Sequence, residues 1–254
     1  MAQIIGQLDA GVIALTLALL MLLAWGIGTW MGRRLRPMGT TKPSKFDDAS
    51  MALLGLLLAF TFGISMSKHD QRRLSVVADS NAIGDFYTCA TLLKEPTRTK
   101  LQAVIREYAT LRLDLSHRPI DNFALESALV RFQQMHDRMT ELVGQALTDG
   151  TPIAVSLTNT LNAVTSNQAA RLAAIRDRLP TSIVMLLFVS AIVTTLLIGR
   201  EQGFTQGSEV VGTWCFILLV TAAIYVTLDL NNPERGFITV SQEPIERLLS
   251  SMSK

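Results

Sequence analysis

Residues able to act as nucleophiles or metal ligands are few and widely spaced in this chain. Its three histidines, His69, His117 and His136, are not separated from one another or from Cys89 by the intervals of metal-binding motifs. The chain also has no glycine-rich phosphate loop, nucleophile elbow or HExxH sequence. We therefore expect a protein that is not an enzyme, with each histidine on the surface or at a helix end.

Oxygen ligands occur together at Asp229, Asn231 and Asn232, and Ca²⁺ prefers ligands of this type. One carboxylate and two amides are few for a metal site. Pro233 and Gly236 follow directly, and this composition is typical of a turn. We interpret the segment as a structural turn, with a weak calcium site as the alternative, and we expect no other cofactor.

The remaining candidate chemistry is electrostatic. Grouped basic side chains raise the local anion concentration at a pore mouth, although the same residues can instead lie at a membrane boundary and pair with lipid headgroups. Acidic or amide side chains near them, including Asp85, would favour cations if they faced the same axis. For Asn81 the ordinary interpretation is a helix cap or a polar core contact. The candidate pore-mouth residues are Arg72, Arg73, Asp79, Asn81, Arg171, Arg176 and Arg178.

The composition is that of a membrane protein. Of the 254 residues, 49% are hydrophobic and only 17% are charged, which is too apolar for an ordinary soluble domain of this length. Uncharged segments long enough to cross a bilayer as helices run between Asp9 and Arg33, Asp48 and Lys68, Arg178 and Arg200, and Glu209 and Asp229. The sequence therefore predicts four transmembrane helices, with both termini on one side.

Charge adds little to this classification. The net charge is +2 and no basic tract of the nucleic-acid-binding type is present, so we expect a lipid bilayer and no nucleic acid as partner. Basic residues in the 33–45 loop, such as Arg33, Arg36 and Lys42, are nearly balanced by those flanking the other spans. The positive-inside rule therefore leaves the orientation open.

The second span is expected to continue as one helical rod from Ala49 to about Leu93, because no proline interrupts it. Small residues recur every four positions and form a packing stripe: Gly55, Ala59, Gly63 and Ser67. We place a second face opposite this stripe, and it consists of the large apolar residues Leu53, Leu57, Phe60 and Ile64. That face contacts lipid or a neighbouring subunit, or it forms the neck of a pore that gates by dewetting.

Four regions follow from this division of the chain. Residues 1–67 hold the first two spans and their basic loop, and residues 68–179 form an extramembrane helical bundle. Residues 180–229 hold the last two spans, and residues 230–254 form a turn and a short amphipathic tail that Pro244 can start. Within 68–179 a polar fourth helix with Asn159 and Asn162 is expected to face partners or water.

Several motifs carry a resemblance to a known family. The run Leu57 to Asp70 resembles the pore-lining segment of bestrophins, and the Asp229–Pro233 turn with Glu243–Ile245 resembles the turn that follows their last span. The order and spacing of further motifs are similar to those of bacterial bestrophin-like proteins. These motifs are Leu54–Leu58, Asn81–Gly84, Leu161–Asn162 with Arg171, Arg176–Pro180 and Asp229–Gly236.

The resemblance implies an all-α, multi-pass protein of the bacterial inner (plasma) membrane. It also implies a homo-oligomeric ion channel, by analogy a pentamer, in which the second span lines the neck and inorganic ions, chloride among them, are the permeant partners. Anions are favoured over cations by the arginines above. The alternative is a non-conducting membrane scaffold or sensor whose helical domain binds a partner, since one architecture can serve several functions.

Overall fold

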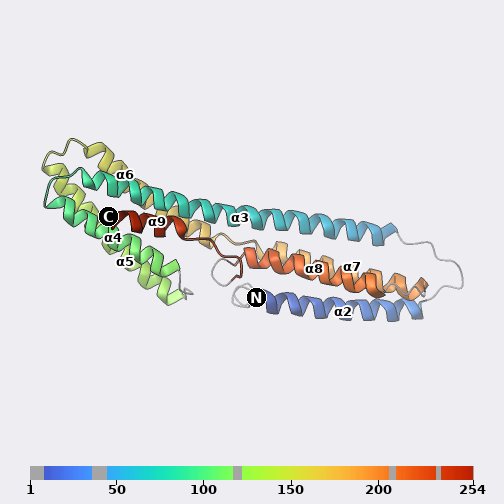
Figure 1. The fold of residues 1–254 in the computed structure, drawn as a ribbon. Helices are drawn as coiled ribbons and strands as arrows, with labels where there is room; N and C mark the ends of the chain where they lie inside the picture. The colour runs from blue at the N-terminus through green and yellow to red at the C-terminus, as the bar shows by residue number, and fades with distance from the viewer. Residues whose placement is uncertain (1–8, 36–44, 117–121, 206–209, 233–235, 254) are drawn as a thin grey trace. The chain divides into compact units, whose positions relative to one another are not determined.

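The structure is a computed structural model that describes residues 9–35, 45–116, 122–205, 210–232 and 236–253. Several residues discussed above lie outside this part of the chain: Arg36, Lys42, His117 and Pro233. The described residues form helices α2 to α9 joined by short connections, and they contain no strand (Figure 1).

Four helical stretches are long and apolar enough to cross a membrane: Ala10–Arg34, Phe46–Thr91, Ala154–Phe204 and Val210–Leu230. They correspond to α2 (Ala10–Arg34), α3 (Lys45–Thr91), α6 (Ala154–Arg176) with α7 (Thr181–Thr205), and α8 (Val210–Leu230). The prediction of an all-α membrane protein with four spans is therefore confirmed.

The chain divides into two compact units. The first, which we call the membrane unit, comprises Met1–His69 and Arg178–Ile238, and the second, the helical unit, comprises Asp70–Asp177 and Thr239–Lys254. These boundaries lie within two residues of the expected divisions at 67 and 179. The predicted 230–254 tail, by contrast, is shared between the units, and its final helix belongs to the helical unit.

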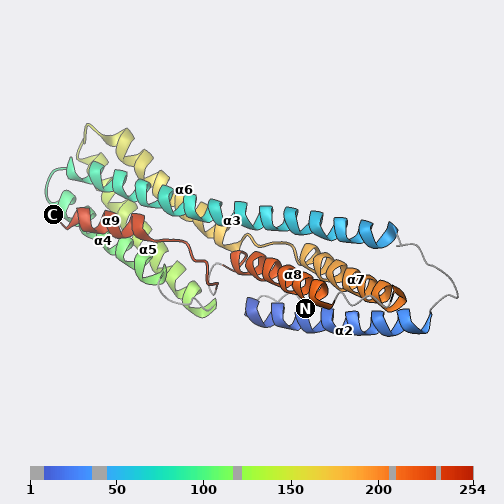
Figure 2. The same ribbon diagram turned by 45° about the vertical axis from the view of Figure 1, so that its right-hand side comes forward.

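Helices α2, α7 and α8 lie side by side in the membrane unit, and α3 lies on the side of α7 and α8 away from α2 (Figures 1 and 2). Their shared core is aliphatic, as expected where the surrounding solvent is also apolar and packing provides the stability. It includes Leu17, Met21, Leu187, Ile217 and Ile224, all less than 5% exposed.

Four glycines bring the backbones of α2 and α7 into direct contact. A Cβ atom on Gly28 would lie 2.2 Å from the carbonyl oxygen of Leu196, and one on Gly199 would lie 2.4 Å from that of Trp25. Gly32 and Gly203 approach the partner helix just as closely. Two glycine pairs spaced four residues apart thus form the tightest helix contact in this unit.

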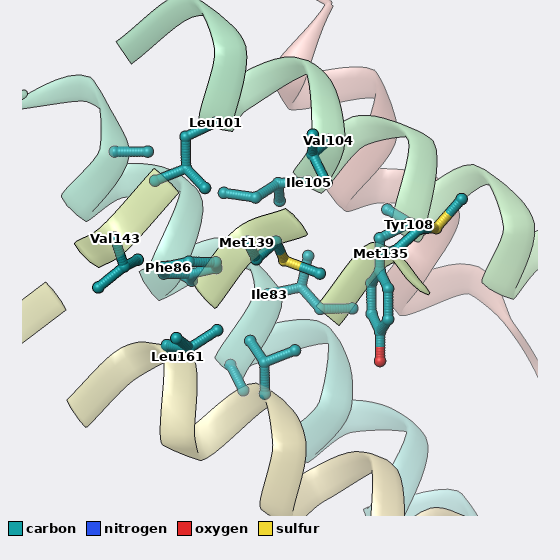
Figure 3. Packing of buried hydrophobic residues seen from close by; sticks show 14 of the residues in the cluster. Ile83, Phe86, Leu101, Val104, Ile105, Tyr108, Met135, Met139, Val143 and Leu161 are labelled. Atoms are coloured by element: carbon teal, nitrogen blue, oxygen red, sulfur yellow. The ribbon is translucent and has the colours of Figure 1, made fainter. Parts of the chain in front are cut away.

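The helical unit is built from the second half of α3, α4 (Thr97–Ser116), α5 (Asn122–Thr148), α6 and the C-terminal α9 (Glu243–Met252). Figure 3 shows its core, in which Phe86 of α3 lies among aliphatic and methionine side chains of α4 and α5. Tyr108 packs edge-on against Phe132, with ring centroids 5.2 Å apart. The inward faces of these helices agree with the apolar periodicity of the sequence.

The tail completes this core. Ile245 of α9 is fully buried, and Ser80 of α3 donates a 2.9 Å hydrogen bond to the carbonyl oxygen of Pro244. A Cβ atom on Gly84 would lie 3.1 Å from the side chain of Leu248, so α9 lies close against α3 at this point. The C-terminal helix is therefore an integral element of the helical unit.

Candidate functional site

The membrane part of α3 is the span least covered by its own chain. In its most apolar window 17% of the residues are buried, against 33% for α2, 33% for the stretch containing α7 and 28% for α8. Between Met51 and Ser67 the buried residues are Leu54, Thr61 and Ser65, which share one face. The remaining circumference of the helix is open to lipid or to other chains.

The small-residue stripe of α3 lies on that open surface. Gly55, Ala59, Gly63 and Ser67 are exposed, and no atom of the chain lies within 4 Å of a Cβ placed on Gly55 or Gly63. At about 100° per residue, the stripe is roughly 160° around the helix from the buried face. It packs against nothing within the described chain, so its role in helix packing stays a prediction for contacts between chains.

The predicted neck residues lie on a third face of α3. Leu53, Phe60 and Ile64 are 53%, 63% and 40% exposed, and Leu57 is half-buried. Helix geometry puts this face roughly 110° from the small-residue stripe, and not opposite it as the sequence analysis placed it. The two faces are thus adjacent, and the neck itself stays a prediction.

Two polar contacts attach the start of α3 to α7. Arg200 Nη2 lies 3.5 Å from Asp47 Oδ1, and the Thr194 hydroxyl donates a 3.4 Å hydrogen bond to the carbonyl oxygen of Ser50. Asp47 is 4% exposed, so its charge is balanced largely within the protein. The sequence analysis did not anticipate this attachment.

Arg72 is a structural residue of the helical unit. It is 3% exposed, and its guanidinium donates hydrogen bonds to the carbonyl oxygens of Ala174 at 3.1 Å and Asp177 at 3.0 Å. The carbonyl groups that end a helix have no partner within it, and a cation stabilises this negative end. Arg72 therefore holds α3 against the C-terminal end of α6.

Asp79, Arg112, Arg171 and Gln242 form a buried charge cluster in the helical unit. Arg171 Nη1 lies 3.0 Å and Arg112 Nε 3.1 Å from Asp79 Oδ2, and the Asp79 side chain is fully buried. Arg171 also donates a 2.9 Å hydrogen bond to Gln242 Oε1 of the tail. Residues of α3, α4 and α6 thus meet at one carboxylate, and the tail joins them through Arg171.

Burial shifts the pKa values of two groups around this carboxylate, Arg171 and Tyr108. Desolvation lowers the pKa of the Arg171 guanidinium, and the neighbouring Arg112 charge acts in the same direction, whereas Asp79 raises it. Desolvation raises the pKa of Tyr108 to about 12. The Tyr108 hydroxyl donates a 3.1 Å hydrogen bond to Gln168 Oε1 of α6, and the Arg112 guanidinium lies over the Tyr108 and Phe132 rings.

These contacts correct part of the predicted pore-mouth set. Arg72, Asp79 and Arg171 are buried inside the helical unit and are paired there, as a buried charge requires. They therefore do not contribute surface charge to a pore mouth. Arg73, Asn81, Arg176 and Arg178 are exposed. Arg112, which the sequence analysis missed, lies four residues after Tyr108 on the inward side of α4, and that spacing was the available signal.

The Asp229 turn is closed by its own carboxylate. Both Asp229 oxygens accept 2.8 Å hydrogen bonds, from the backbone N–H groups of Phe237 and Ile238, and Asn231 Oδ1 accepts one of 2.7 Å from that of Leu179. A Cβ on Gly236 would lie 2.7 Å from the Asp229 carbonyl oxygen, so the turn depends on glycine there. The geometry is that of a structural turn.

Within the part of the chain that the structure describes, no group of three or more histidine, cysteine or acidic side chains is arranged to hold a metal ion. Cys89 and Cys215 form no disulfide bond, and Cys215 lies on the exposed surface of α8. The described residues offer paired charges, exposed apolar helix faces and close backbone contacts.

The fold and the site define a multi-pass, all-α membrane protein with one sparsely covered spanning helix and a charge-stabilised helical unit. A family model, the Bestrophin-like domain, matches residues 14–245, which is nearly the whole chain. The chain therefore belongs to the bestrophin-like family, as the resemblance of its motifs indicated. No curated protein matches the sequence.

Proposed function

We propose that the protein is a homo-oligomeric ion channel of the bacterial inner (plasma) membrane, with α3 of each copy lining a shared axis. A pentamer is the assembly suggested by the resemblance to bestrophins. The function is passage of inorganic ions and not catalysis, and it requires no cofactor.

The observation that carries the proposal is the sparse covering of α3. The α3 helix contacts its own chain on one face, so its two other faces are available for contacts with lipid or other chains. One of these faces carries small residues and the other carries large apolar residues. Small residues such as Gly63 allow a neighbouring helix to approach closely, whereas the adjacent face carries the large, exposed side chain of Phe60. One face suits subunit contact and the other suits an axis.

A ring of Leu53, Leu57, Phe60 and Ile64 side chains would form a hydrophobic neck. Water is held poorly between apolar walls at close range, so ions pass only when such a constriction widens and fills. Smaller side chains at the same positions would hold water more readily. The neck is therefore expected to limit the current.

Exposed arginines support a preference for anions. Arg73 follows the membrane part of α3 and Arg176 ends α6, and both side chains are exposed. Asp79 adds no negative charge to the surface, because it is buried with two arginines. Asp85 is exposed and acts in the opposite direction, so the sign of the selectivity is a direct test of which groups line the pathway.

The experiment is recording from purified protein in planar bilayers under a salt gradient. We expect currents whose reversal potential lies close to the equilibrium potential of chloride. A reversal potential near that of the cation would contradict the selectivity. Silence across conditions would instead favour a scaffold or sensor whose helical unit binds a partner.

Variants of the neck separate a pore wall from a lipid contact. Phe60→Ala and Ile64→Ala should increase or alter the current, because they remove apolar bulk from the constriction. The matched control is Leu219→Ala on α8, whose side chain is 67% exposed compared with 63% for Phe60. An equal effect of the control would mean that Phe60 contacts lipid.

A further inference from the structure

The C-terminal end of α2 combines an aromatic ring with two arginines. The guanidinium carbon of Arg34 lies 4.3 Å from the centroid of the Trp30 ring, which is within the range of a cation–π contact. Arg33 and Arg34 are both exposed, and neither side chain forms an ion pair or a hydrogen bond within the described chain. The exposed indole N–H of Trp30 has no partner there either. Positive charge and available hydrogen-bond donors are thus gathered at one helix end.

Acidic residues do not balance this charge. No Asp or Glu occurs between Asp9 and Asp47 in the sequence. Asp47 is buried and paired with Arg200, and it belongs to α3, which lies on the side of α7 and α8 away from α2 (Figures 1 and 2). The described chain therefore leaves the two guanidinium groups at the end of α2 available to an anion.

An exposed apolar face of α2 leads directly to these arginines. Its members follow one another at intervals of three or four residues, and each is more than half exposed: Leu15, Leu19, Leu23, Ile27 and Trp30. No atom of the chain lies within 4 Å of a Cβ placed on Gly26, so the face is open beside Leu23 and Ile27. From Leu23 to Arg34 the helix rises about 16 Å, close to half the thickness of the hydrocarbon core. An acyl chain of one leaflet can therefore lie along this face while its headgroup reaches Arg34.

The phosphate group of a lipid is the anion that fits both parts of this surface. A guanidinium group can bind two phosphate oxygens at once, and tryptophan side chains favour the level of the headgroups. A soluble anion would contact the arginines alone and leave the apolar face unused. A zwitterionic headgroup would bring its own positive charge close to Arg33 and Arg34. A lipid with a net negative headgroup matches the charge and the apolar face together.

We infer that the C-terminal end of α2 binds an anionic phospholipid. The lipid phosphate lies between Arg33 and Arg34, the headgroup contacts Trp30, and an acyl chain follows Leu23 and Ile27 into the bilayer. This lipid site is separate from the proposed pore on α3, and it does not depend on whether the protein conducts ions.

Native mass spectrometry of the delipidated full-length protein tests the site. Given equal amounts of phosphatidylglycerol and phosphatidylcholine with the same acyl chains, the protein should retain mainly phosphatidylglycerol. Each arginine near an anionic membrane surface contributes about fivefold to the attraction, so Arg33→Gln with Arg34→Gln should lower the ratio of the two bound lipids about tenfold or more. Lys100→Gln with Arg131→Gln, which removes the same charge from exposed sites on α4 and α5, should leave the ratio unchanged.

Three outcomes of that measurement would overturn the inference. The wild-type protein could retain both lipids equally, the two pairs of substitutions could have the same effect, or an excess of inorganic phosphate could displace the lipid, which would show that the arginines bind a soluble anion.

Tryptophan fluorescence in vesicles gives an independent readout. The emission that Trp30→Phe removes belongs to Trp30. Phosphatidylglycerol with brominated acyl chains should quench this emission at a severalfold lower mole fraction than brominated phosphatidylcholine. Equal quenching by the two lipids would mean an ordinary bilayer contact. Quenching by neither would mean that protein covers this face, and either result would contradict the site.

Discussion

Asp79 of α3 and Arg171 of α6 form a 3.0 Å ion pair in the interior of the helical unit, although 91 residues separate them in the sequence. Arg112 shares the same carboxylate oxygen at 3.1 Å. The cluster therefore holds two positive charges and one negative charge. Asp79 is the residue on which both arginines depend.

Replacing Asp79 should be the most damaging change to this cluster. Asp79→Asn leaves two buried guanidinium groups without a counter-charge, and the loss of one partner of a buried pair costs about 3–5 kcal/mol. Arg171→Met should cost less, because Asp79 keeps Arg112. Hydrogen–deuterium exchange of α4 and α5 peptides measures the stability of the helical unit directly.

The control for the Asp79 variant is an exposed ion pair. Glu243 and Arg247 are paired across one turn of α9 with side chains 58% and 78% exposed, and Glu243→Gln should change stability by at most about 1 kcal/mol. If Asp79→Asn were as mild as Glu243→Gln, the cluster would not stabilise the unit.

The sequence alone does not predict which charged residues pair in the cluster around Asp79. Asp79, Arg171 and the exposed Arg73 look alike in the sequence, since each is a charged residue near the end of an apolar segment. Periodicity identifies the inward face of a single helix, but which side chains meet across helices is decided by tertiary packing. Arg112 on the apolar side of α4 was the visible signal, because a charge at a core position requires a partner.

Substituting glycine where α2 meets α7 should separate these helices. Gly28→Ala places a methyl group where a backbone oxygen lies 2.2 Å away, and overpacking of this kind costs about 1–3 kcal/mol or more. Gly26→Ala on the same helix, with no atom within 4 Å, is the control. Thermal unfolding in detergent should show a lower Tm for the first variant. Equal Tm values would refute the close contact.

Glycine positions also show what a pattern leaves undetermined. Small residues recur every four positions in the stripe that contains Gly55 and Gly63, and the pairs Gly28–Gly32 and Gly199–Gly203 have the same spacing. Only the two pairs bring helices of the described chain together, at the contact between α2 and α7. Spacing predicts that a backbone can approach but does not identify the partner. Helix ends were more predictable, since Pro96 and Pro180 directly precede α4 and α7.

Tyr108 should titrate at a higher pH than an ordinary tyrosine. Its pKa of about 12 lies above the usual value of about 10, so its contribution to stability is complete below pH ~10 and is lost as the pH rises toward 12. Phenolate absorbance of the folded protein should show a late phase that Tyr108→Phe removes. A wild-type titration curve identical to that of Tyr108→Phe, apart from amplitude, would contradict this assignment.

The Asp229 turn should be stable without a metal ion. Asp229→Asn removes the charge that binds two backbone N–H groups and should lower stability by about 1–3 kcal/mol. Because those N–H groups already occupy the carboxylate, addition of Ca²⁺ or of a chelator should leave the Tm of the wild-type protein unchanged. An increase in Tm with Ca²⁺ that Asp229→Asn abolishes would establish the calcium alternative.

Accessibility of Ile64 tests the central claim, that α3 lines a water-filled pathway, most directly. In a background with Cys89 and Cys215 replaced, Ile64→Cys should lose or change its current when a charged, membrane-impermeant thiol reagent is added, while Leu219→Cys on α8 should not respond. Reaction of neither residue, or of both at the same rate, would contradict an axial position for α3.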